Sequence, residues 1–121
     1  MREILFRGKR VDNNEWVYGF LSKSRGNNHF LSLCIDREEN GVMLSSIVEP
    51  ETIGQYTGLT DKNGKKIFEG DIVSISKEDE RGVVRWEDSD AVYVIGCDGN
   101  IDLSFLENLW GRDVEVIGNI H

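Results

Sequence analysis

Apolar and polar residues alternate in short runs through the first half of the chain, where helical periodicity is weak. Alternation with a period of two buries one face of a strand and leaves the other in water, which is typical of antiparallel sheets. Turn-forming Gly, Asn and Asp residues separate these runs. The pattern therefore predicts four strands in this half, at residues 2–9, 15–22, 29–36 and 42–49.

The second half repeats this pattern and adds one helical signal. Ser104 and Glu107 have the spacing of a capping box, and Gly111 stands where a helix of one or two turns would end. Strands are predicted around this turn, at residues 70–76, 82–88, 91–96 and 113–120, with a further short strand near 101–103.

These elements predict a mostly β protein made of two lobes. Residues 1–58 are expected to form an N-terminal antiparallel β lobe. Residues 59–121 are expected to form a small SH3-like barrel, because three or four strands, a short helical turn near 105–110 and a last strand suit that fold. The alternative is one continuous compact domain, since 121 residues fit either arrangement.

The glycine-rich run GQYTGLTDKNGKKIFEGDIV, residues 54–73, raises the question of a ligand-binding loop. An EF-hand loop beginning at Asp61 would place Lys65 at a position that needs an oxygen ligand. A Walker loop needs serine or threonine after its lysine, and Lys66 stands there instead. The segment therefore predicts a hairpin with a turn at residues 61–64, whose Asn-Gly pair adopts positive φ at low cost.

The formal charge of −8 is unevenly distributed. Residues 1–49 hold seven basic and seven acidic residues, whereas residues 50–121 hold seven basic and fifteen acidic ones. Direct nucleic-acid binding by the second part is therefore not expected, because phosphate contacts need basic residues. The acidic excess would suit a basic partner protein, or it serves only to keep the chain in solution.

The cysteines and the apolar runs bear on the compartment. No apolar run approaches the roughly 18 residues of a membrane helix, and the first ten residues lack the apolar core of a signal peptide. Cys34 and Cys97 lack the close spacing of a secreted disulfide framework. We expect a cytoplasmic protein with two free thiols and no membrane association, while a single disulfide between these cysteines stays open.

Catalytic, cofactor and metal sites are not predicted. His29 and Cys34 are an odd number of positions apart, so on one strand their side chains point to opposite faces. The two cysteines and two histidines also lack the paired spacing of zinc ligands. Carboxylates in the predicted turns are solvated groups that could attract a divalent cation only weakly. The chain is expected to be no enzyme and to need no cofactor.

Two groups of residues are candidates for a protein-interaction surface. Trp16 and Tyr18 share one strand face by parity; core packing is their ordinary role, but exposed aromatics would anchor an interface. Glu78, Asp79 and Glu80 form an acidic turn that would face a basic partner. Edge strands also give a small β protein a ready way to form homo-oligomers.

Three motifs resemble the YopX family, small proteins encoded by bacteriophages and prophages of Gram-positive bacteria. They are PETIGQYTGLTDKNGKKIFEGDIV at residues 50–73, RGK followed by EWVYG near the start, and VIGNI at 116–120. The resemblance spans nearly the whole chain. It implies a mostly β fold, a phage or prophage origin, a cytoplasmic location in the infected cell and self-association, but it implies no activity.

The expected function is therefore that of a non-enzymatic, self-associating acidic module that binds a host or phage protein. The alternative is a nucleic-acid-associated or enzymatic factor built on the SH3-like barrel, with strands 70–76 and 82–88 as its platform. The acidic charge of the second half weighs against that alternative.

Overall fold

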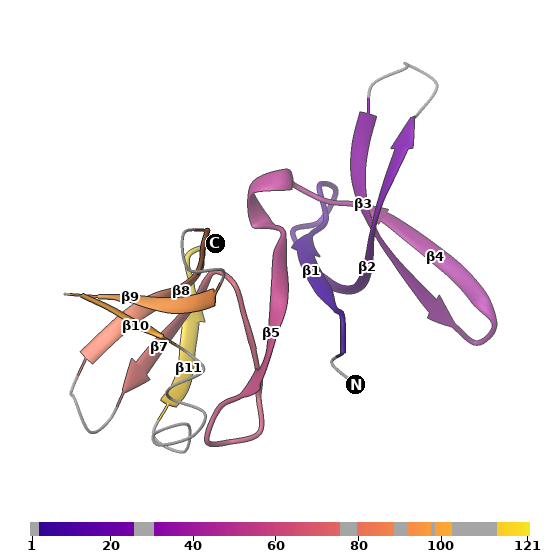
Figure 1. Cartoon of the computed structure of the whole chain (residues 1–121). Coiled ribbons are helices and arrows are strands. Elements are labelled where there is room, and N and C mark those ends of the chain that lie inside the picture. The colour runs from indigo at the N-terminus through magenta and orange to yellow at the C-terminus, as the bar shows by residue number, and fades with distance from the viewer. Residues whose placement is uncertain (1–2, 26–30, 76–79, 89–91, 98, 103–113) are drawn as a thin grey trace. The chain divides into compact units, whose positions relative to one another are not determined.

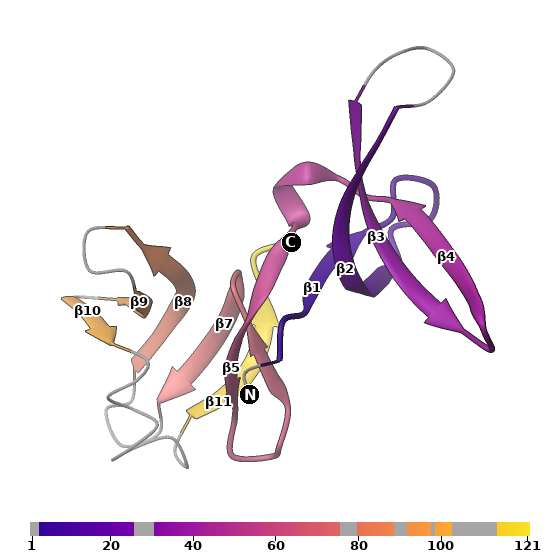
Figure 2. The same ribbon diagram turned by 45° about the vertical axis from the view of Figure 1, so that its right-hand side comes forward.

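The computed structural model describes residues 3–25, 31–75, 80–88, 92–97, 99–102 and 114–121. The chain divides into two compact units, Met1–Gln55 and Tyr56–His121, each of which is described by itself. Antiparallel strands build both units (Figure 1, Figure 2), and the only helical element in the described residues is the 3-10 helix η1, Pro50–Thr52. The prediction of a mostly β fold is confirmed.

The first unit is an antiparallel meander in the strand order β4-β3-β2-β1-β5. Each of the first four strands pairs with its neighbour along the chain, and the start of β5 returns to lie beside β1. The strand bounds are β1 Phe6–Lys9, β2 Trp16–Arg25, β3 Leu31–Glu39, β4 Val42–Ile47 and β5 Gly54–Thr60.

Strand β2 changes its partner in the middle. As far as Gly19 it pairs with β1, and from Phe20 onward it pairs with β3. A Cβ added at Gly19 would collide with the carbonyl oxygen of Asp36 and lie 3.3 Å from Cγ2 of Ile35. The glycine of the EWVYG motif is therefore needed because the two backbones approach closely where the partners change.

A small core holds the first unit together. Val17, Ile35 and Val48 are nearly inaccessible to solvent, and Phe6 and Ile53 pack against them. These side chains come from separate segments, so their burial fixes the meander and the start of β5 in one unit. Strand β4 itself contributes no buried side chain.

The second unit contains a five-stranded antiparallel sheet in the order β10-β9-β8-β7-β11. The predicted closed barrel is wrong: in the described residues β10 pairs only with β9 and β11 only with β7, so the sheet stays open. The predicted helical turn near 105–110 lies outside the described residues. The remaining strand bounds are β6 Lys66–Phe68, β7 Asp71–Ile75, β8 Glu80–Glu87, β9 Val92–Cys97, β10 Gly99–Asp102 and β11 Val114–Asn119.

The core of the second unit is larger and follows the predicted alternation. Val73 and Ile75 on β7 are fully buried, whereas Ile72 and Ser74 at the alternate positions are only half-buried. The same cluster joins one face of four strands of this sheet to Ile67 of β6. Its other buried members are Val84, Tyr93, Ile95, Val114 and Val116. One-sided burial of this kind stabilises an antiparallel sheet mainly through the hydrophobic effect.

The glycine-rich segment forms the predicted hairpin, between β5 and β6. Its turn is organised by the Asp61 side chain, which is only 6% exposed. The carboxylate accepts N–H bonds from Asn63 and Lys65 in the turn and from Val116 on β11, each at 2.9 Å. Asp61 therefore ties the hairpin to the last strand and is a structural residue rather than a metal ligand.

Asp61 also predicts a pH dependence of stability. Burial opposes ionisation, but the amides of Val116, Lys65 and Asn63 and the charge of Lys65 outweigh it, so the pKa of Asp61 is lowered. Such a group stabilises the fold above its unfolded pKa, near ~4, and that contribution is lost as the pH falls through the folded pKa. We expect the urea midpoint of the second unit to fall with acidification below about pH 4, and to fall less in Asp61→Asn. Equal pH dependence in both proteins would contradict this assignment.

Candidate protein-interaction surface

The even-numbered residues at the start of β2 form an aromatic stripe on one face of the first unit. Tyr18 is 46% exposed and Phe20 is 62% exposed, whereas Trp16 is half-buried. Val17 and Gly19 between them are buried on the opposite face. Trp16 and Tyr18 thus share a face, as their spacing predicts, and Tyr18 has the exposure of an interface anchor rather than of a core residue.

Two cations from β1 hold the base of this stripe. The Arg7 guanidinium carbon lies 4.7 Å from the centroid of the Trp16 ring, and the Lys9 ammonium lies 5.4 Å from it. The register explains this contact, because Lys9 stands opposite Trp16 and Arg7 stands opposite Tyr18. Cation–π contacts of this type contribute roughly 0.5 to 2 kcal/mol each. The RGK motif therefore fixes the indole and gives the stripe a rigid base.

Strand β4 adds further exposed apolar side chains at the edge of the sheet. Met43 is 60% exposed, and Val42, Leu44 and Ile47 are also exposed. The strand contains no charged residue and no proline, although natural edge strands commonly carry such residues to block pairing with other chains. The chemistry of β4 therefore favours contact with another protein strand.

We refer to the exposed large apolar residues of β2, β3 and β4 as the apolar set. Its members lie on both faces of the sheet, because Phe20 and Leu21 are neighbours on one strand, as are Met43 and Leu44 on another. Exposed large apolar side chains that gather on one part of a soluble protein mark interaction sites. The members are Tyr18, Phe20, Leu21, Leu31, Val42, Met43, Leu44 and Ile47.

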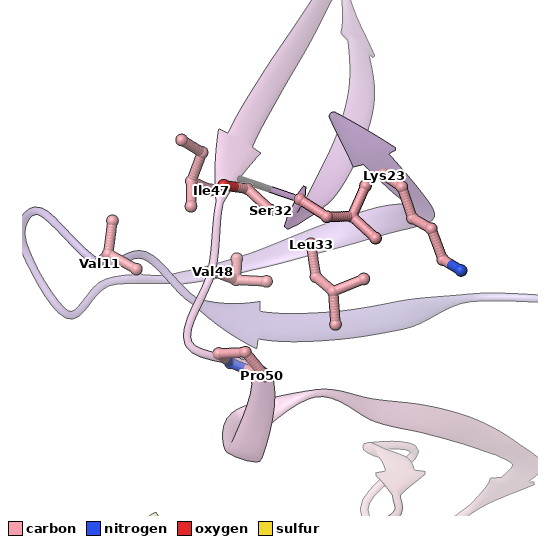
Figure 3. A pocket seen from close by; sticks show the side chains of 8 residues that line it. Val11, Lys23, Ser32, Leu33, Ile47, Val48 and Pro50 are labelled. Atoms are coloured by element: carbon pink, nitrogen blue, oxygen red, sulfur yellow. The ribbon is translucent and has the colours of Figure 1, made fainter. Parts of the chain in front are cut away.

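A groove with a volume of about 550 Å³ lies beside the apolar set, where β4 leaves β3 (Figure 3). The Val48 N–H donates to the Leu33 carbonyl oxygen at 3.1 Å, which pairs the backbone at this point. The groove can accept an apolar side chain of a partner, because Lys23 is the only charged residue among the described ones that line it. The other described lining residues are Val11, Leu31, Ser32, Leu33, Ile47, Val48 and Pro50.

The acidic candidates belong to the other unit. Glu80 begins β8, where it stands opposite Ile75, whereas Glu78 and Asp79 lie outside the described residues. Trp16 and Tyr18 belong to the first unit, so the two predicted groups do not form one site within a single unit.

Cys34 is a buried free thiol on β3. Buried in this way, it behaves as a small apolar residue rather than as a nucleophile. His29, the other residue of the candidate Cys–His pair, lies outside the described residues. Within the described part of the chain, no three His, Cys, Asp or Glu side chains are grouped to hold a metal ion.

Among the described residues, no helix has the length and apolar character needed to cross a bilayer.

Comparisons with known proteins add the following findings. A family model described as YopX protein matches residues 5–121, which include both units. The chain is also similar to the crystal structure of protein EF1440 from Enterococcus faecalis, with 25% sequence identity and a TM-score of 0.49. That similarity covers 100% of this chain and 95% of that chain. No curated protein matches the chain.

Proposed function

The chain belongs to the YopX family, and we propose that this member is a non-enzymatic protein-interaction module that self-associates. We further propose that it acts in the cytoplasm of a bacterial host, as a phage or prophage product, by binding a host or phage protein. The observation that carries self-association is the apolar set of the first unit, which includes an uncharged edge strand.

The size of the apolar set supports this proposal. Fully burying a large apolar side chain stabilises by about 1.5 to 3 kcal/mol, so covering a side chain that is half-exposed contributes roughly 1 kcal/mol. Four members lie on each face of the sheet, so a two-fold contact that covers one face of both copies would contribute on the order of 8 kcal/mol. Association costs about 4 to 15 kcal/mol, so this gain is of the size needed to offset that cost.

The distribution of charge supports a different surface for binding the host or phage protein. The whole formal charge of −8 lies in residues 50–121, whereas the apolar set lies in the neutral residues 1–49. An acidic surface attracts basic partners and speeds their association at low salt. Self-association and partner binding would thus use chemically different parts of the chain.

Charge reversal at the acidic turn tests the binding of a basic partner. We expect Glu78→Lys, Asp79→Lys and Glu80→Lys together to reduce capture of basic proteins from host lysate several-fold, because rim charges govern association. The matched control reverses three acidic residues of the first unit, Glu15, Glu49 and Glu51, and so has the same net charge. Mass spectrometry of the captured proteins gives the readout. If the native chain captures only itself at low salt, the proposed partner is ruled out.

A further inference from the structure

The ladder between β3 and β4 determines which backbone groups of β4 face outward. The Val48 N–H donates to the Leu33 carbonyl oxygen, and the β3–β4 register places these two residues opposite each other. In an antiparallel ladder, the N–H and C=O of alternate residues face the neighbouring strand. The backbone groups of every second residue, counted back along β4 from Val48, therefore point toward β3. The backbone groups of Met43, Ser45 and Ile47, which alternate with them, point away from β3.

One end of this outer edge is already occupied. The Val11 N–H donates to the Ile47 carbonyl oxygen at 3.1 Å. Met43 and Ser45 remain, and the described residues make no backbone hydrogen bond to their outward groups. These two residues present a short row of donors and acceptors, with exposed apolar side chains and no charge along the strand.

We propose that two copies of the chain pair antiparallel along β4, with Leu44 on the two-fold axis; this rests on the proposed self-association and names its contact. In this register Met43 exchanges two hydrogen bonds with the partner's Ser45, and symmetry repeats the exchange, which gives four in all. Leu44 stands directly opposite the partner's Leu44. The two β4 strands then join the meanders of both copies into one sheet.

The two ends of β4 select this register. A two-fold axis at Ser45 would place Met43 opposite the partner's Ile47 and would need the Ile47 carbonyl oxygen as an acceptor. That oxygen already accepts the Val11 N–H. An axis at Met43 would bring Gly41 into the ladder, but Gly41 has φ +79°, a left-handed turn conformation rather than an extended one. An axis at Leu44 uses the two unoccupied outward residues and no others.

The charges next to β4 are compatible with this pairing. Arg37 stands beside Leu44 in the β3–β4 register, and Glu38 stands beside Met43. Across the proposed contact, Arg37 and the partner's Arg37 would be three strand spacings apart, about 14 Å. This exceeds the Debye length of about 8 Å at physiological salt, so their repulsion is screened. The same spacing separates Glu38 from the partner's Asp36.

Cysteine cross-linking tests the register. Directly opposed residues of a non-hydrogen-bonded antiparallel pair have Cα atoms about 4.5 Å apart, within the range of a disulfide. Diamide, which takes up the two electrons and two protons of the thiols, should therefore link Leu44→Cys into covalent dimers on non-reducing gels. The matched control is Val42→Cys on the same face, whose Cα lies about 14 Å from the partner's Val42 in this register. The native chain controls for Cys34 and Cys97.

The outcomes separate this inference from the proposed function. Efficient cross-linking of Leu44→Cys, with the native chain and Val42→Cys remaining at background, is the expected result. If light scattering shows the native chain to be oligomeric but Leu44→Cys does not cross-link, or Val42→Cys links equally well, the β4 register is wrong while self-association stands. If the native chain is a single chain in solution, the proposed self-association fails together with the register.

Discussion

Replacing Asp61 with alanine is expected to destabilise the second unit by about 3 to 5 kcal/mol, because it removes a buried carboxylate with three backbone partners. The bond from the Val116 amide is buried, and leaving this amide without an acceptor costs about 1 to 3 kcal/mol. The bonds from the Asn63 and Lys65 amides are only partly buried and contribute about 1 kcal/mol each. Urea unfolding followed by circular dichroism measures the loss. Hydrogen exchange of the Val116 amide should become faster in parallel.

A neighbouring residue of the same turn provides the control. The Lys62 ammonium lies 3.3 Å from the Glu115 carboxylate, and both side chains are about two-fifths exposed. An exposed ion pair contributes roughly 0 to 1 kcal/mol, so Lys62→Ala should change the stability by no more than that. If Asp61→Ala were as mild as Lys62→Ala, Asp61 would not hold the hairpin to β11.

The role of Asp61 shows what the sequence could and could not predict in this segment. Its polar residues and the Asn-Gly pair predicted the hairpin turn, because turn chemistry is local. The bond from the Val116 amide to the Asp61 carboxylate joins residues 55 positions apart. No local pattern encodes such a contact, since it depends on where β11 lies in the folded unit.

The same distinction applies to the sheets. Alternation of apolar and polar residues predicted the strands, because it records which face of each strand is buried. Closure of a barrel depends instead on strand tilt and on the register around the sheet, which strand order alone does not determine. The five-stranded sheet therefore shows the predicted alternation along its strands. Its edge strands β10 and β11 do not pair with each other in the described residues, so the predicted barrel does not close.

The candidate surface was predictable in part. Parity placed Trp16 and Tyr18 on one face, but it could not show that Tyr18 is exposed, because exposure depends on whether another layer covers that face. The contribution of β4 was missed, although the sequence VMLSSI carried a signal: six residues of a predicted strand without any charge or proline. That signal acquires meaning only once β4 is known to be an edge strand.

Replacing Leu44 with lysine is expected to weaken self-association at least tenfold. In the proposed pairing, two ammonium groups would face each other beside Arg37 and the partner's Arg37. Like charges about 4 Å apart repel by about 1 kcal/mol in water and about 4 kcal/mol near a protein surface, and tenfold weakening needs only about 1.4 kcal/mol. Leu44 lies outside the core, so the first unit should keep its fold. The control is Ile120→Lys, an exposed apolar residue of the second unit.

Sedimentation velocity of the native chain, from about 1 to 100 μM, measures the self-association of the intact protein. The average mass should rise with concentration from that of one chain, 13.8 kDa, toward at least that of two chains. Leu44→Lys should need at least tenfold higher concentrations to reach the same average mass, and Ile120→Lys should behave as the native protein. A native chain that sediments as a single 13.8 kDa species at every concentration would show that the protein does not self-associate.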